Sequence, residues 1–161
     1  MKLSISTRRM VRGGLIAAAY AVLCMAFFTF SYGDIQFRVS EALTILPLLM
    51  PEAVPGLFIG CLLSNLLGGM GILDIVFGSL ATLIAALLTR WMRHLPKAIA
   101  VLPVVIVNAF VIGGVVLHLG AGLPLWLSIG TVGLGELTVV YLLGLPLYAA
   151  LNRMLPQKYR R

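Results

Sequence analysis

Long apolar runs constrain this chain more than any other feature of its sequence. A helix needs ~20 mostly apolar residues to cross a membrane. Of the 161 residues, 61% are hydrophobic, which is typical of an integral membrane protein rather than of a soluble domain. The links between the runs are short, so we expect one transmembrane domain over residues 1–161. Five runs have the required length, at roughly 13–30, 53–70, 74–89, 98–118 and 124–150.

Basic residues fall into three clusters that predict how the chain is oriented. One cluster precedes the first run, one lies between the runs at 74–89 and 98–118, and one follows the last run. Because Lys and Arg concentrate in cytoplasmic loops, we expect all three clusters inside the cell. The net charge of +7 is then a topology signal, and it does not indicate a nucleic-acid partner. The clusters contain Lys2, Arg8, Arg9, Arg12, Arg90, Arg93, Lys97, Arg153, Lys158, Arg160 and Arg161.

A sixth crossing is needed because a chain with both ends inside must cross the membrane an even number of times. The first run leads out of the cell, and the runs at 53–70 and 74–89 cross in opposite directions, so one more crossing must lie between the first run and residue 53. Only residues 39–50 are available, and this segment is short and contains Pro47. A short, irregular crossing is tolerated where it is buried in protein or lines a cavity. We therefore expect an all-α integral membrane bundle of six transmembrane helices with both termini cytoplasmic.

Polar residues inside the runs predict a cavity that opens outward. Glu136 is the most informative, because a carboxylate at mid-membrane costs about 2.5–3.5 kcal/mol and usually marks a substrate or ion site. By the expected depths, four polar residues lie in the outer half, with Asn108 and Glu136 below them. Tyr141 lies deeper than the other aromatic residues and could line the same cavity. The six polar residues are Arg38, Glu41, Asn65, Asp74, Asn108 and Glu136.

Each of these residues also has a purely structural interpretation. Asp74 could serve as a helix N-cap. Arg38 and Glu41 are three positions apart and could pair with each other. Asn65 and Asn108 could form interhelical hydrogen bonds, which is the commoner role of a lone membrane Asn.

Small residues predict where helices approach closely. They recur at every fourth position of the run at 53–70, and we expect this face to pack inside the bundle: Gly56, Gly60, Ser64 and Gly68. The first run carries two small pairs that either pack internally or dock another membrane protein: Gly14 with Ala18, and Ala17 with Ala21.

Other residues receive simpler expectations. Tyr20 and further aromatic residues near the ends of the runs should form an interfacial belt. Glu52 should cap the helix that begins beside it. Cys24 and Cys61 fall inside runs and are expected to be small packing residues.

The motifs of several function classes are missing. The sequence has no Walker A motif, no Gly-x-Ser-x-Gly elbow and no His/Cys cluster, so we expect no ATP hydrolysis by this chain, no enzyme activity, no metal and no cofactor. Without an inverted repeat, six helices are also a poor stand-alone transporter. A binding bundle powered by partners is favoured, ahead of a proton-coupled carrier that uses Glu136 as relay, and ahead of a membrane enzyme.

Several segments resemble the signature of the queuosine-precursor transporter family, and the likeness runs over most of the chain from residue 14 onward. The matching segments are FRVSEALTILP at 37–47, PGLFIGCLLSNLLGG at 55–69, LDIVFGSLATL at 73–83, VNA at 107–109, GLGE at 133–136 and LGLPL at 143–147.

The resemblance implies a function, because that family is similar to the substrate-binding (S) components of energy-coupling-factor transporters. Such a protein lies in the bacterial plasma membrane and binds a queuosine precursor, a 7-deazaguanine-type base or queuine, from outside. It delivers the ligand through a transmembrane scaffold (T) component driven by two cytoplasmic ATPases. An S component for another vitamin or purine-like metabolite is the alternative within this class.

The resemblance also implies roles for individual residues. The docking face of the first helix, usually Ala-x-x-x-Ala, corresponds to Gly14 with Ala18, and Ala17 and Ala21 lie beside it. For the ligand, the carboxylate of Glu136 or Glu41 would accept from the adjacent N–H donors of the base. Asn108 and Asn65 would contact the ring, and Asp74 could meet a ligand amine.

Overall fold

The structure is a computed structural model that describes residues 5–28, 37–120 and 122–154. The described residues are helical and contain no strand. Two shorter apolar helices accompany four helical segments that are long and apolar enough to cross a membrane. The long segments are Thr7–Ala26, Asp74–His94, Lys97–Gly120 and Leu125–Met154, and the short ones are Val39–Leu48 and Ala53–Leu67. The predicted all-α class is therefore confirmed, and a helix lies in each predicted segment.

Several of these segments change their helical winding along their length. The first three elements are α1 (Ile5–Ala26), the 3₁₀-helix η1 (Val39–Leu48) and α3 (Ala53–Leu67). The fourth segment comprises the π-helical η2 (Asp74–Gly78), α4 (Ser79–Trp91) and η3 (Met92–His94). The fifth comprises α5 (Lys97–Ala100), α6 (Leu102–Asn108) and the π-helical η4 (Ala109–Gly120). The sixth comprises α7 (Leu125–Val139), the π-helical η5 (Val140–Gly144) and α8 (Leu145–Met154).

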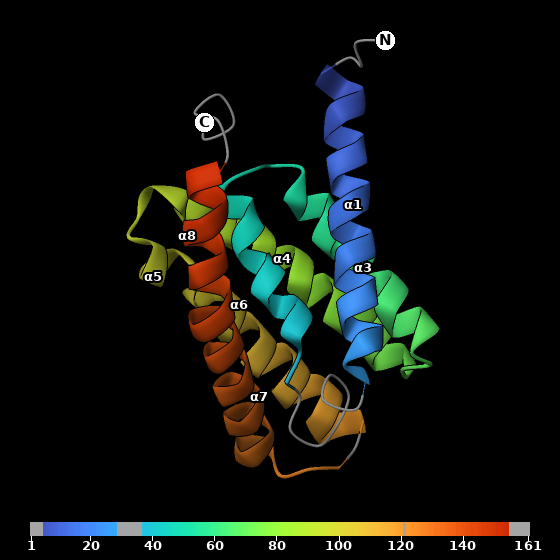
Figure 1. Ribbon diagram of the computed structural model, residues 1–161. Coiled ribbons are helices and arrows are strands. Elements are labelled where there is room, and N and C mark those ends of the chain that lie inside the picture. The colour runs from blue at the N-terminus through green and yellow to red at the C-terminus, as the bar shows by residue number, and fades with distance from the viewer. Residues whose placement is uncertain (1–4, 29–36, 121, 155–161) are drawn as a thin grey trace.

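The short helix η1 lies in the middle of the bundle (Figure 1). It contacts α1, α3, α4, α7, η5 and α8. All of its residues except Val39 and Leu43 are buried. This is the environment that so short a membrane helix requires, because its polar backbone is shielded by protein rather than by lipid.

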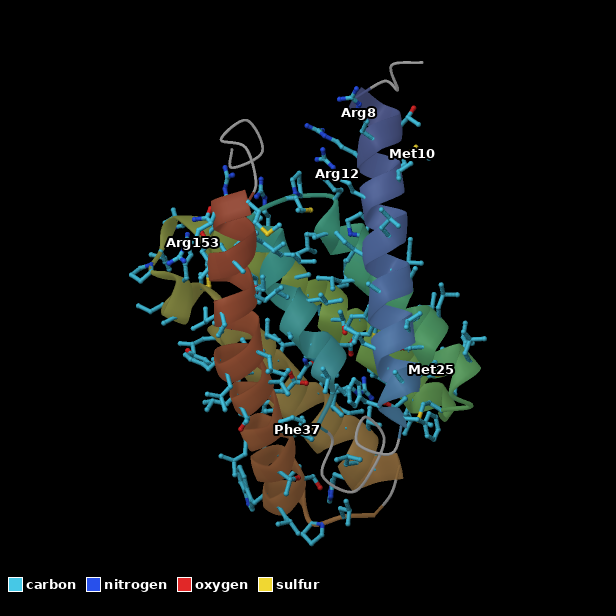
Figure 2. All side chains as sticks on the ribbon, viewed as in Figure 1. Arg8, Met10, Arg12, Met25, Phe37 and Arg153 are labelled. Carbon is cyan, nitrogen blue, oxygen red and sulfur yellow. The ribbon has the colours of Figure 1, made fainter. Side chains whose placement is uncertain are left out.

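One end of the bundle collects the basic residues. The start of α1 and the end of α8 both lie at this end, at the top of Figure 1, and Figure 2 shows Arg8, Arg12 and Arg153 there. Arg90 joins them, because its Nη1 donates to the carbonyl oxygen of Pro47 at the end of η1, at 3.1 Å. We call this the basic end. Lys2, Lys158, Arg160 and Arg161 lie outside the described residues, and the cytoplasmic location of this end stays a prediction.

The helices α1 and α3 are in backbone contact. A Cβ atom on Gly60 would lie 2.8 Å from the carbonyl oxygen of Ala17, and one on Gly56 would lie 2.7 Å from that of Gly13. The small face of α3 therefore packs inside the bundle, as predicted. It divides the small residues of α1 into two sets: Ala17 and Ala21 are buried, whereas Gly14 and Ala18 are exposed.

Polar and apolar residues occupy different halves of η1. Ile45, Leu46 and Leu48, toward the basic end, belong to the main apolar core together with Leu57 and Val104. Ser40, Glu41 and Thr44, in the other half, are buried and polar. The candidate site is built around this polar half.

Candidate ligand site

Glu41 lies at the centre of a buried polar cluster, and only 1% of its surface is exposed. The hydroxyl of Tyr20 on α1 donates a hydrogen bond to its Oε1. The hydroxyl of Thr44 donates to the Glu41 carbonyl oxygen at 2.5 Å. One turn further along α1, the sulfur of Cys24 lies 3.0 Å from the hydroxyl oxygen of Ser40. Glu41 is thus held both at its backbone and at one carboxylate oxygen.

Asn108 at the end of α6 and Glu136 on α7 meet Glu41 in the same cluster. The two carboxylates interact electrostatically, and the side chain of Asn108 lies beside both. The structure therefore brings together three of the predicted ligand-binding residues from three different helical segments.

Three atoms of this trio have unused hydrogen-bonding capacity. Glu41 Oε2, Glu136 Oε2 and Asn108 Nδ2 are buried and make no hydrogen bond with any residue that the structure describes. Most buried polar atoms in proteins have a partner, because burial without one costs free energy. These two acceptors and one donor are consequently the best candidates for contact with a ligand. Two hydroxyls on α4, those of Ser79 and Thr89, share this property.

Arg38, Asp74 and Asn65 form a second polar group beside the first. Arg38 Nη2 lies 3.0 Å from Asp74 Oδ1 in a buried ion pair. The side-chain nitrogen of Asn65 donates to the Asp74 carbonyl oxygen at 2.8 Å. Arg38 also interacts electrostatically with Glu41 and Glu136. The second group therefore ties the start of η1 to η2 and α3 and supplies positive charge to the carboxylates.

The structure decides between several of the alternatives that the sequence left open. Asp74 pairs with Arg38, and no side chain caps the start of η2. Arg38 makes its ion pair with Asp74 rather than with Glu41. Asn65 forms an interhelical hydrogen bond, whereas the amide nitrogen of Asn108 does not. Arg38 also supplies positive charge near Glu136.

Two predicted residues make contacts elsewhere. The hydroxyl of Tyr141 donates to the carbonyl oxygen of Ala98 on α5 at 2.5 Å, outside the polar cluster. Glu52 occupies the N-cap position of α3, as expected, but its side chain makes no capping hydrogen bond. Glu52 instead pairs with Arg12 of α1 at 3.0 Å, which ties α1 to the turn before α3.

Tyr20 is the cluster residue that the sequence analysis placed wrongly. It was expected at the membrane interface, yet it is fully buried. A signal was present in the sequence: Gly13, Ala17, Tyr20 and Cys24 are spaced by four, three and four residues, so they share one face of a helix. That face packs against α3 and η1.

Cys24 and Cys61 are buried free thiols, as expected for packing residues. Among the described residues, no group of three or more His, Cys, Asp and Glu side chains could hold a metal ion.

Comparison with known proteins identifies the family. The model of the QueT transporter family matches residues 10–153. The chain is 30% identical over 141 residues to the queuosine precursor transporter QueT of Lactococcus lactis subsp. cremoris (strain MG1363), an alignment covering 80% of this chain and 83% of that protein. No solved structure matches significantly. Together with the four membrane-length helices, these matches define a multi-pass protein of the bacterial plasma membrane. The chain therefore belongs to the QueT transporter family.

Proposed function

We propose that this chain is the substrate-binding S component of an energy-coupling-factor importer and that it captures a queuosine precursor at the Glu41–Asn108–Glu136 trio. The observation that carries the proposal is the set of three buried atoms that have no hydrogen-bond partner in the described part of the chain. The name of the Lactococcus relative supports the ligand class.

The trio complements one edge of a 7-deazaguanine base. That edge offers a ring N–H and an exocyclic amine as adjacent donors, followed by a carbonyl acceptor. Carboxylates only accept hydrogen bonds, whereas an amide nitrogen only donates. Because Glu41 Oε1 already accepts from Tyr20, we assign one ligand donor to Glu41 Oε2 and the other to Glu136. The carbonyl of the base then accepts from Asn108 Nδ2.

The remaining polar residues support the site without direct ligand contact. The carboxylate of Asp74 is held by Arg38, and the Asn65 amide is held by the Asp74 backbone. We assign Arg38 the further role of balancing the charge of the two ligand-binding carboxylates.

Ligand binding to the purified full-length chain in detergent tests the site. The ligands are queuine, 7-deazaguanine precursors and guanine, with riboflavin as a control of similar polarity and different edge chemistry. Saturable binding of bases that carry the guanine-type edge, without riboflavin binding, supports the proposal. A folded chain that binds none of these bases contradicts it.

The exposed small residues of α1 support docking on a scaffold subunit. Gly14 and Ala18 are exposed, and a Cβ atom on Gly14 would meet nothing within 4 Å. Small residues allow a second membrane helix to approach closely. Ala17 and Ala21 are covered by the bundle itself, so we place docking on the Gly14–Ala18 face alone.

Ala18→Trp tests docking separately from ligand binding. In cells that also contain the scaffold and the ATPases, this change should abolish uptake of the ligand while the purified variant still binds it. Leu134→Trp is the matched control, since Leu134 is 68% exposed on α7, away from the α1 face. Uptake that survives Ala18→Trp would contradict docking at this face.

A self-sufficient proton-coupled carrier is the second candidate. The observation that favours it is the close pair of buried carboxylates, Glu41 and Glu136, since intramembrane carboxylates also serve as proton relays. Vesicles that contain only this chain distinguish the two functions. An S component should bind ligand without accumulating it, whereas accumulation driven by a proton gradient would establish the carrier.

A further inference from the structure

We infer that Tyr20 is a positioning residue that makes the site selective for a base with two adjacent donors. The inference rests on the proposed function, because it concerns the same trio of ligand-binding side chains. It assigns a role in specificity to a residue of α1 that does not itself face the ligand.

Tyr20 is rigidly seated between two helices. Tyr20 is fully buried. Its Cβ packs directly against Gly60, because a Cβ atom added to Gly60 would lie only 2.8 Å from it. Only glycine at position 60 lets α1 approach α3 so closely. The ring is therefore fixed in place, and its hydroxyl reaches Glu41 Oε1.

This contact determines which acceptor Glu41 offers. One oxygen of the carboxylate is occupied by Tyr20, and Thr44 holds the backbone of the same residue. Among the residues that the structure describes, Oε2 is the oxygen that has no hydrogen-bond partner. Without the Tyr20 hydroxyl, the carboxylate would be free to rotate and to offer either oxygen.

Selectivity follows from the number of fixed acceptors. With Glu41 and Glu136 each presenting an oxygen, a base with both donors satisfies both carboxylates. A base that lacks the exocyclic amine leaves one buried carboxylate oxygen without a partner, which is costly. A Glu41 side chain that can turn away reduces this penalty, so discrimination between the two bases should fall.

The experiment compares two bases that differ only in the exocyclic amine, 7-deazaguanine and 7-deazahypoxanthine, on full-length protein in detergent. The wild-type chain should prefer 7-deazaguanine by roughly tenfold or more, because the second base leaves a charged acceptor unpaired. Tyr20→Phe keeps the ring that packs against α3 and removes only the hydroxyl. It should lower that preference to about twofold or threefold, mainly by weakening binding of 7-deazaguanine.

Cys24→Ala is the matched control. Cys24 lies one turn further along α1 and contacts Ser40, the neighbour of Glu41, without touching the Glu41 carboxylate. Its loss should change the stability of the α1–η1 contact and leave the preference between the two bases unchanged.

The outcomes separate this inference from the function on which it rests. If the wild-type chain binds neither base, the proposed function is overturned together with the role of Tyr20. If the wild-type chain binds 7-deazaguanine but Tyr20→Phe keeps the full preference, or Cys24→Ala lowers it equally, only the role of Tyr20 is overturned.

Discussion

Glu136→Gln replaces a carboxyl group of the proposed site by an amide while keeping the size of the side chain. Glu136 is only 5% exposed, and its Oε2 has no partner among the described residues. Any donor that the ligand brings to this oxygen therefore forms a desolvated, charge-assisted hydrogen bond.

The expected loss of affinity follows from that geometry. Hydrogen bonds to charged groups contribute about 1.5–3 kcal/mol, roughly twice the contribution of neutral ones. Gln retains one neutral acceptor, so we take the lower part of this range. A loss of about 1.5 kcal/mol corresponds to a dissociation constant raised roughly tenfold.

Folding should respond in the opposite direction. Glu136 repels the nearby carboxylate of Glu41, so removal of its charge relieves that repulsion. We expect the thermal unfolding temperature in detergent to stay the same or to rise. This separates a loss of ligand contact from a loss of structure.

Isothermal titration of the purified variant with a 7-deazaguanine ligand measures the effect. Glu52→Gln is the matched control, because Glu52 is also a buried glutamate but pairs with Arg12 at the basic end. Its ligand affinity should be unchanged. A folded Glu136→Gln protein with wild-type affinity would refute the assignment of Glu136 to the site.

Two further predictions concern stability and are checked by thermal unfolding in detergent. Gly60→Val should destabilise the protein strongly, because even the Cβ of valine would lie 2.8 Å from the Ala17 carbonyl oxygen. Gly14→Val is the control and should have little effect, because a Cβ atom there meets nothing within 4 Å. Equal destabilisation by both changes would contradict the α1–α3 contact. Arg38→Met should destabilise by about 3–5 kcal/mol, because it leaves the buried carboxylate of Asp74 without its partner. Additional Asp74→Leu should restore part of that stability, and no recovery would argue against the pair.

Much of the fold could be predicted because bilayer thickness limits the length of helices. Even the short segment at 39–50 could be located, because the number of membrane crossings must be even. Its burial as η1 is what a short helix with Pro47 requires. The small residues of α3 likewise predicted a close helix contact. They could not specify the partner helix, because a pattern of small residues permits close approach without saying which helix approaches.

The pairing of polar residues was harder to predict. Arg38 and Asp74 are 36 positions apart, and Arg12 and Glu52 are 40 apart, so neither pair follows from helical spacing. Local spacing allowed Arg38 to pair with Glu41, but tertiary packing brings it to Asp74 instead. Tyr20 was grouped with the aromatic residues near the membrane interfaces, although the face of α1 on which it lies packs against α3 and η1.

The most direct measurement of the central claim is an experimental structure of the full-length protein with a bound 7-deazaguanine ligand. We predict that the donor edge of the base lies within hydrogen-bond distance of Glu41 Oε2 and Glu136, and that its carbonyl faces Asn108 Nδ2. A ligand bound elsewhere in the bundle, with these three side chains still without contact to it, would contradict the account.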